Sequence, residues 1–167
     1  MSVYGTLLLA GAMASARSGD RQATLVQLDE AESFAKQLGR DANHLWTAFG
    51  PTNVAIHRVA TSVALGDVGA AYSQTASIEP TRLPLERRVR YAFDIARVHT
   101  ERDEIDDAVV GMLEAERLAP EQVHHHVMSR QIIADLRRAP AGRTKDALAQ
   151  LAHRVEDAQF ASLGPSA

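Results

Sequence analysis

The sequence predicts an all-α fold, and three observations support this prediction. Valine and isoleucine recur at intervals of three and four residues, as in helices, rather than in the alternating pattern of strands. Breaks that contain glycine or proline divide the chain into about eight segments of helical length. Hydrophobic residues make up 46% of the 167 residues but aromatic residues only 5%, which suits closely packed helices with small aliphatic side chains. We therefore expect a single helical domain over residues 1–167.

The first predicted pair of helices occupies residues up to about 38. A turn at Gly19-Asp20 separates its two helices, because glycine adopts the backbone angles that a tight turn requires. Small residues at Gly11-Ala12 and Ala31 lie where two helices can cross closely. These features predict a helical hairpin.

The second predicted hairpin turns at Gly66-Asp67. This turn lies 47 residues after the turn at Gly19, whereas the next turn, at Asp103, follows after 37 residues. A common type of helical-hairpin repeat has a period of about 34 residues, so the longer interval predicts an insertion over residues 38–51. The insertion carries Trp46, the single tryptophan of the chain.

The third predicted hairpin matches the tetratricopeptide repeat pattern best. In order, the matching positions are Ile95, Ala96, His99, Ala108, Met112, Ala115 and Pro120. Pro120 is expected to end the second helix, since proline lacks an N–H and disfavours helix in the residue before it. A fourth pair, over residues 127–138 and 144–158, matches least, as expected for a terminal unit. The sequence thus predicts an all-α, tetratricopeptide-like α-solenoid of about four helical hairpins.

Three stretches resemble one family of bacterial regulators: FGPTNVAIH at 49–57, LGD at 65–67 and LEAERLAPE at 113–121. They resemble the C-terminal helical-repeat half of helix-turn-helix transcriptional regulators from filamentous, high-GC Gram-positive bacteria. In that family an N-terminal lambda-repressor-like domain binds DNA, and the repeat region is presumed to sense a ligand or mediate assembly. This sequence shows no turn followed by a basic recognition helix. We therefore expect no DNA-binding domain in this chain, and DNA contact only through a domain absent from it.

Composition excludes several other functions. Lys and Arg total 18 against 21 Asp and Glu, a net charge of −3, whereas a nucleic-acid-binding domain is usually strongly basic. The absence of cysteine excludes disulfides, thiolate metal sites and a cysteine nucleophile. No nucleophile elbow, metal-ligand signature or phosphate loop is found, so we expect no enzymatic activity and no cofactor.

Two clusters of chemically active residues have simple structural explanations. His124, His125 and His126 are consecutive, and neighbours on a helix point about 100° apart, so no shared metal ion is expected. An acidic turn surrounds Arg102 and consists of Glu101, Asp103, Glu104, Asp106 and Asp107. Capping of the following helix by its carboxylates is a sufficient explanation for most of this charge.

The candidate ligand-binding site combines two helices with the insertion. In a hairpin solenoid the first helix of each pair lines the concave side, and side chains three or four residues apart share one helix face. The expected ligand-binding residues are Asn53, His57, Thr61, Arg90, Phe93, Arg97 and Trp46. Arginine pairs with carboxylate or phosphate and asparagine hydrogen-bonds peptide backbone, so the expected ligand is a peptide or a small anion.

An ordinary solvated face is the alternative explanation of the same residues. In that case His57 is a structural histidine, Asn53 caps its helix after Pro51, and Trp46 fills the core. The functional expectation is a non-enzymatic ligand-sensing or oligomerisation domain of a transcriptional regulator. The alternative is a protein–protein interaction scaffold without a small ligand, and in either case a homodimer is expected.

The N-terminus bears on localisation. Residues 7–13 are apolar and are followed by Ala14-Ser15-Ala16, which imitates a signal-peptide cleavage site. Residues 1–6 contain no Lys or Arg, and the apolar run is far shorter than the roughly 18 residues of a spanning helix. We expect a cytoplasmic protein without a membrane partner.

Overall fold

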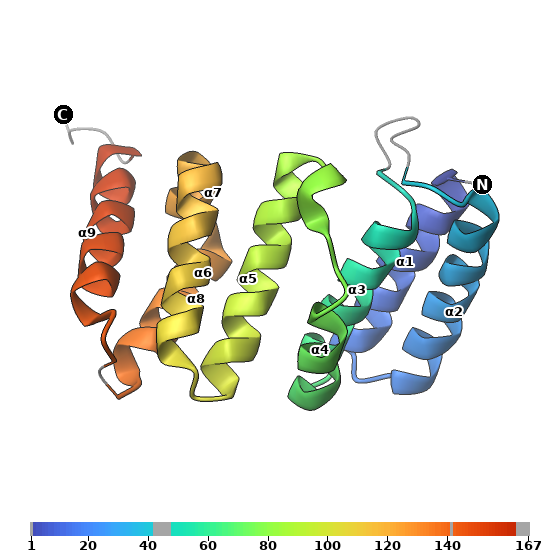
Figure 1. The fold of residues 1–167 in the computed structure, drawn as a ribbon, viewed down its shortest axis with the longest axis horizontal. Helices are drawn as coiled ribbons and strands as arrows, with labels where there is room; N and C mark the ends of the chain where they lie inside the picture. Colours follow the sequence, from blue (N-terminus) through green and yellow to red (C-terminus); the bar gives the residue numbers. More distant parts are fainter. Residues whose placement is uncertain (1, 42–47, 141, 163–167) are drawn as a thin grey trace. The chain divides into compact units, whose positions relative to one another are not determined.

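The structure is a computed structural model, and it describes residues 2–41, 48–140 and 142–162. The elements in this part of the chain are all helices, which confirms the all-α prediction (Figure 1). None of the described helices combines the length and the apolar character needed to cross a bilayer. The described residues divide into two compact units, Met1–Arg87 and Arg88–Ala167, and each is described by itself. The single domain over 1–167 stays a prediction.

The first unit contains two helical hairpins. Its elements are α1 (Ser2–Arg17), α2 (Arg21–Leu38), α3 (Pro51–Ala64), α4 (Val68–Thr75) and the short 3-10 helix η2 (Pro80–Arg82). Helix α1 packs along α2, and α3 contacts α1, α2 and α4 (Figure 1). The small residues expected at the helix crossing, Ala12 and Ala31, are fully buried.

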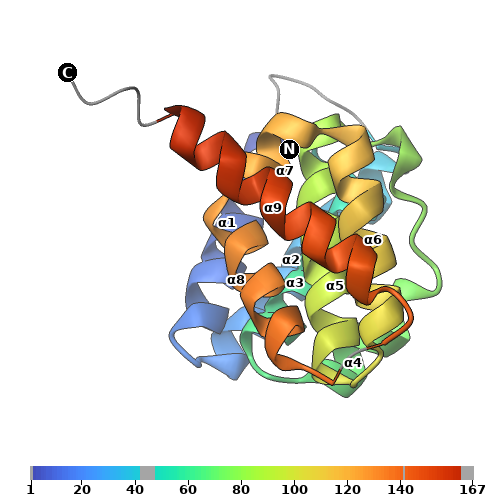
Figure 2. The same ribbon diagram turned by 90° about the vertical axis from the view of Figure 1, so that its left-hand side faces the viewer.

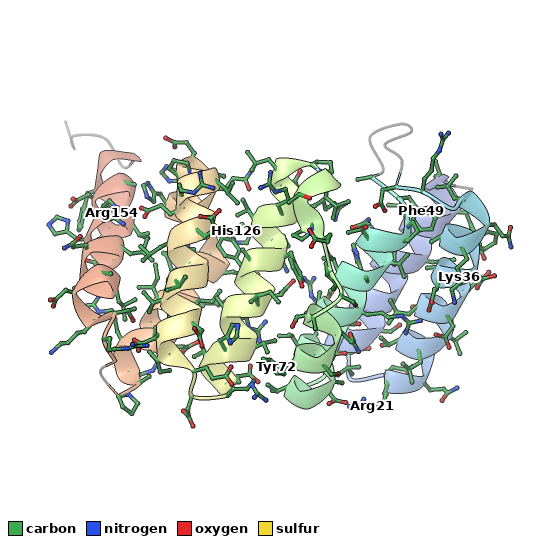
Figure 3. The ribbon with its side chains drawn as sticks, in the orientation of Figure 1. Arg21, Lys36, Phe49, Tyr72, His126 and Arg154 are labelled. Carbon is green, nitrogen blue, oxygen red and sulfur yellow. The ribbon has the colours of Figure 1, made fainter. Side chains whose placement is uncertain are left out.

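Phe49 is fully buried and belongs to the core of the first unit (Figure 3). Its ring lies against Gly5 of α1, and a Cβ added to Gly5 would come within 2.2 Å of Phe49 Cζ. Glycine at this position therefore lets the ring reach the helix backbone. Of the predicted insertion, residues 42–47 lie outside the described part of the chain.

The two hairpin turns of the first unit are built in the same way. Gly19 and Gly66 have φ values of +80° and +73°, in the left-handed region that favours glycine. The aspartate after each glycine caps the next helix: Asp20 accepts from Ala23 N at 2.9 Å, and Asp67 accepts from Ala70 N at 3.2 Å. The turns predicted at residues 19 and 66 are thus confirmed, with a defined capping chemistry.

The described residues of the second unit form five helices. They are α5 (Leu85–Glu101, in the unit from Arg88), α6 (Ile105–Leu118), α7 (Pro120–His125), α8 (Val127–Arg138) and α9 (Lys145–Ser162). Helix α9 lies across α6, α7 and α8 (Figure 2). Ala96, Ala108, Met112 and Ala115, four positions of the repeat pattern, are fully buried in one continuous core.

The short helix α7 was not expected from the sequence. Pro120 follows the end of α6 at Leu118, as predicted, but it also begins α7. Proline suits the first position of a helix, where its missing N–H would have no intrahelical partner. Val123 of α7 is fully buried in the core of the second unit.

Candidate ligand pocket

The structure places three of the seven predicted site residues in the interior. Asn53 is 0% exposed, and Thr61 and Phe93 are each 1% exposed. Such side chains do not line an open face, so an exposed polar stripe through Asn53 and Thr61 is not observed. Asn53, His57 and Thr61 belong to the first unit and Arg90, Phe93 and Arg97 to the second, and the groove that would join them stays a prediction. Trp46 lies outside the described residues.

Two of the predicted site residues on α3, His57 and Thr61, make hydrogen bonds to the backbone of their own helix. Thr61 Oγ1 donates to the His57 carbonyl oxygen at 2.8 Å, and His57 Nδ1 lies 2.8 Å from the Asn53 carbonyl oxygen. The side chain of Asn53 has no hydrogen-bond partner among the described residues, so the capping role expected for it is not observed. Asp41 takes that role, since its carboxylate accepts from Thr52 N at 2.9 Å and from Thr52 Oγ1 at 2.5 Å.

The buried ring of Phe93 packs against the ring of His126 and does not face an open groove. Its ring centroid lies 5.4 Å from that of His126, with the two planes tilted by 52° (Figure 3 labels His126). Backbone N–H of Met128 donates to His126 Nδ1 at 3.1 Å, so His126 caps α8. Burial, together with the nearby charges of Arg90 and Arg130, lowers the pKa of His126 and favours the neutral ring that this bond requires.

The other two histidines of the run have separate partners. His124 Nε2 lies 2.7 Å from Glu116 Oε1, and His125 Nε2 lies 3.4 Å from Glu121 Oε2. Together with the capping role of His126, this gives each ring its own partner in the structure.

Arg97 lines a shallow polar hollow. Its guanidinium is 3.9 Å from Glu101, and the hollow, of about 370 Å³, also includes Met128, Gln131, Asp135 and Arg138. Arg138 pairs with Asp135, one turn earlier on α8. The arginines here therefore already have acidic neighbours, which weakens the case for an anion site.

A larger pocket lies where α8, α9 and the segment between them meet. We name it the α8–α9 pocket; its volume is about 400 Å³. The lining residues are Ile105, Leu136, Arg137, Ala139, Pro140, Gly142, Thr144, Lys145, Leu148, Ala149, Ala152, His153 and Glu156. Ligand pockets typically combine such an aliphatic floor with a few polar groups at the edge.

The segment before α9 is tied to the start of α6 through Asp106. The Asp106 carboxylate accepts from Thr144 Oγ1 at 2.8 Å, from Thr144 N at 3.0 Å and from Arg143 Nε at 3.2 Å. These bonds hold the pKa of Asp106 below its ordinary value, the Thr144 hydroxyl contributing most. A Cβ at Gly142 would lie 2.4 Å from Asp106 Oδ1, so glycine allows this close approach.

Two ion-pair systems hold the α9 wall of the pocket. Arg137 Nη1 lies 2.9 Å from Glu156 Oε1 and links α8 to α9. Deeper in the unit, Glu116 of α6 accepts from Arg154 Nε at 2.7 Å and Nη2 at 2.6 Å, and it also contacts His124 (Figure 3 labels Arg154). The Glu116 side chain is only 13% exposed, so this network is partly shielded from solvent.

The rim of the pocket is basic. It carries Arg137, Lys145 and His153 and one acid, Glu156. Arg137 pairs with Glu156, and His153 Nδ1 lies 2.6 Å from Asp157, so Lys145 is the positive charge left at the rim. Within the described residues, Lys145 has no hydrogen bond or ion pair through its side chain. Sequence analysis missed this pocket; its one local signal is the Pro140 to Gly142 break, which separates two helices more widely than a two-residue turn does.

Comparison of the chain with protein-family models, curated proteins and solved structures gives no significant match in any of the three.

Proposed function

We propose that this chain is a non-enzymatic binding module of tetratricopeptide-like helical hairpins that holds a small amphipathic ligand in the α8–α9 pocket. The observation that carries the proposal is the pocket itself, with its aliphatic floor and basic rim. In the biological setting that the sequence resemblance suggests, ligand binding makes the chain the sensing part of a cytoplasmic transcriptional regulator. DNA is then bound by a domain outside this chain.

The lining residues define the chemistry of the ligand. Leu136, Leu148 and Ala152 are buried and offer only apolar contacts, so the body of the ligand is apolar. Lys145 at the rim offers a positive charge, so the ligand carries an acidic group at one end. A volume near 400 Å³ suits a molecule of this kind. The proposed ligand is still a small anion, as expected from the sequence, but its proposed site is the α8–α9 pocket and not the groove beside Asn53 and Arg97.

Dodecanoate is a suitable probe, because it has one carboxylate and a single aliphatic chain. We expect the untagged full chain to bind it in calorimetry, and native mass spectrometry of protein from cell extract to show a bound small species. Ala149→Trp should weaken dodecanoate binding by roughly tenfold or more, because Ala149 lines the pocket but is exposed and can be enlarged without disturbing the core. Ala134→Trp, at an exposed position of the polar hollow, is the matched control.

Two charge variants separate this pocket from the groove expected from the sequence. Lys145→Glu should weaken dodecanoate binding about two- to fivefold, as for a solvent-exposed charge pair. Arg97→Ala should leave it unchanged. If Arg97→Ala abolishes binding while Ala149→Trp does not, the ligand lies in the polar hollow instead. If neither dodecanoate nor any species from the extract binds, the ligand-sensing proposal is rejected.

A protein-interaction scaffold is the second candidate, and the outer face of α1 favours it. Val3, Leu7, Ala10 and Ala14 are exposed at helical spacing, with Leu7 64% exposed, and Arg17 is the single charged residue of this helix. A helix face of this kind is typical of a surface that packs against a protein partner. The partner expected from the sequence is a second copy of the chain.

Sedimentation analysis tests this second candidate. We expect the wild-type chain to sediment as a dimer over a micromolar concentration range, and Leu7→Lys to shift it to monomer. Val110→Lys, at an exposed apolar position of α6, is the control. A monomeric wild type at all concentrations would argue against self-association through α1.

A further inference from the structure

We propose that His99, Glu104 and Asp107 form a binding site for a divalent transition-metal ion of the zinc and cobalt class. Each residue offers one ligand atom, and these three atoms all lie within 4.8 Å of one another. The site lies at the turn between α5 and α6, and none of its three residues lines the α8–α9 pocket, although Ile105, between Glu104 and Asp107, does. It is independent of the proposed function.

The backbone of the turn holds the three residues in place. His99 is in the last turn of α5, Glu104 immediately precedes α6, and Asp107 is in the first turn of α6. Glu104 N donates to the His99 carbonyl oxygen at 2.9 Å, and Asp103 between them has a φ of +60°. Because the ligands are carried by helix ends that share a hydrogen bond, their spacing is largely preorganised.

The other two hairpin turns share this backbone but not these side chains. The bond from Glu104 N to the His99 carbonyl corresponds to Asp20 N with Ser15 and to Asp67 N with Ser62, both at 2.9 Å. At the position of Asp107 those turns have alanine, Ala23 and Ala70. The third turn thus has a histidine and a carboxylate where the equivalent turns have serine and alanine.

The carboxylate of Glu104 is also used differently. Asp20 and Asp67 cap their helices through the backbone N–H three residues on, whereas Glu104 makes no such bond. Instead, Glu104 Oε2 lies 2.7 Å from His99 Nδ1, and Oε1 accepts from Arg102 Nε at 3.0 Å. Helix capping, a sufficient explanation from the sequence, therefore does not explain the position of this carboxylate.

An ion can enter with little rearrangement. Arg102 holds one oxygen of Glu104, as a supporting residue commonly does for a ligating carboxylate, and the other oxygen faces His99. The metal would then lie between His99 Nδ1 and Glu104 Oε2, in place of their direct contact at 2.7 Å.

The donor set selects the metal. One imidazole nitrogen and two carboxylate oxygens suit Zn²⁺, Co²⁺ or Ni²⁺ better than Mg²⁺, which prefers oxygen ligands and water. Metal–ligand bonds of about 2.0–2.1 Å place ligand atoms roughly 3.3 Å apart in a tetrahedral site. The observed separation of 2.7 Å between His99 and Glu104 and the 4.8 Å limit for the whole group lie on either side of this value. Three protein ligands leave one position for water or an exogenous group.

The experiment is a titration of the untagged full chain with Co²⁺, followed by visible d–d absorption, and with Zn²⁺, followed by calorimetry. We expect one ion per chain. His99→Gln, Glu104→Gln and Asp107→Asn should each weaken binding about tenfold or more. Asp107 is exposed, so Asp107→Asn keeps the test valid if a change at His99 disturbs folding.

Matched controls identify nonspecific binding by surface histidines. His153→Gln removes an exposed histidine that lies 2.6 Å from Asp157, and His125→Gln removes one near Glu121; neither should alter binding. Absence of one-to-one binding, or equal losses in the control variants, would overturn the proposal. Dodecanoate affinity should be the same for His99→Gln and wild type, so failure here and failure of the proposed function are distinguishable.

Discussion

The α1–α2 hairpin and the α8–α9 hairpin show how two pairs of helices with similar topology come to have different interiors. In α1–α2, the fully buried positions include Ala12, Ala16, Ala31 and Ala35. The backbone contact between these helices is far more extensive than that between α8 and α9. Small side chains let the helix axes approach and the backbones pack closely.

Larger side chains and a longer connection characterise α8–α9. Its buried positions include Ile132, Leu136, Leu148 and Leu151, and residues 139–144 separate the helices, whereas α1 and α2 are joined by residues 18–20. The pocket lies beside this connection. The comparison teaches that small side chains at the crossing and a short turn accompany close packing of two helices, whereas larger side chains and a longer turn accompany a pocket at the end of the hairpin.

The largest effect on stability is expected from a substitution in the core of the first unit, which contains the α1–α2 hairpin. Phe49→Ala should lower the free energy of unfolding by about 3–5 kcal/mol, because it removes a fully buried ring that packs on Gly5. Urea denaturation measures the change. Phe160→Ala, at a ring that is 75% exposed, should change stability by less than about 0.5 kcal/mol. Equal losses in the two variants would contradict the assignment of Phe49 to the core.

Enlarging an alanine should distinguish the two hairpins directly. Ala31→Leu should destabilise the protein by about 1–3 kcal/mol, since it forces the closely packed α1 and α2 apart. Ala149→Leu, which adds the same atoms at the edge of the α8–α9 pocket, should cost less than about 0.5 kcal/mol. Thermal unfolding of both variants gives the comparison. A larger cost for Ala149→Leu would mean that the pocket is filled.

The Glu116 network should make the second unit sensitive to acid. Glu116→Gln should cost about 1–3 kcal/mol near neutral pH, because Arg154 and His124 lose their charged acceptor. The Arg154 guanidinium, with help from His124, holds the pKa of Glu116 below its ordinary value of 4.5. This stabilising contribution is fully present above that value and is lost as pH falls through the lower pKa of the folded state.

A pH series tests the sign of this effect. The difference in unfolding free energy between wild type and Glu116→Gln should shrink as pH is lowered below about 4.5. A difference that stays constant down to strongly acidic pH would show that the ionised carboxylate contributes nothing.

The smallest effect is expected at a helix cap. Asp20→Ala should cost about 1 kcal/mol, because Ala23 N loses its acceptor at the start of α2. Asp20→Asn should retain most of the stability, since asparagine also caps helices. Chemical denaturation of the two variants measures the difference. A loss in Asp20→Asn as large as in Asp20→Ala would show that capping is not the role of Asp20.

Much of the fold could be predicted because its signals are local. The turns at Gly19 and Gly66 follow from the backbone freedom of glycine, and burial of Ala96 and Ala108 follows from the repeat spacing. The sequence does not predict helix α7, because Pro120 marks the end of one helix and suits the start of another equally well.

The candidate site was harder to predict. Helical spacing shows which residues share one face of a helix, but it does not show whether another helix covers that face. Asn53, Thr61 and Phe93 share the spacing of exposed stripes and are nevertheless buried. The metal-ligand set was missed for a related reason. His99 and Asp107 are eight residues apart and come together only through the geometry of the turn.

By itself, the sequence determined that this chain is helical, where three of its tight turns lie and which small residues are buried, because periodicity and turn chemistry act over a few neighbouring residues. Only the tertiary structure decided that Gly142 approaches Asp106, that Arg154 reaches Glu116 and that α8 and α9 leave a pocket between them. These features depend on the distances between helices. Those distances are set by the combined packing of side chains that are far apart in the chain.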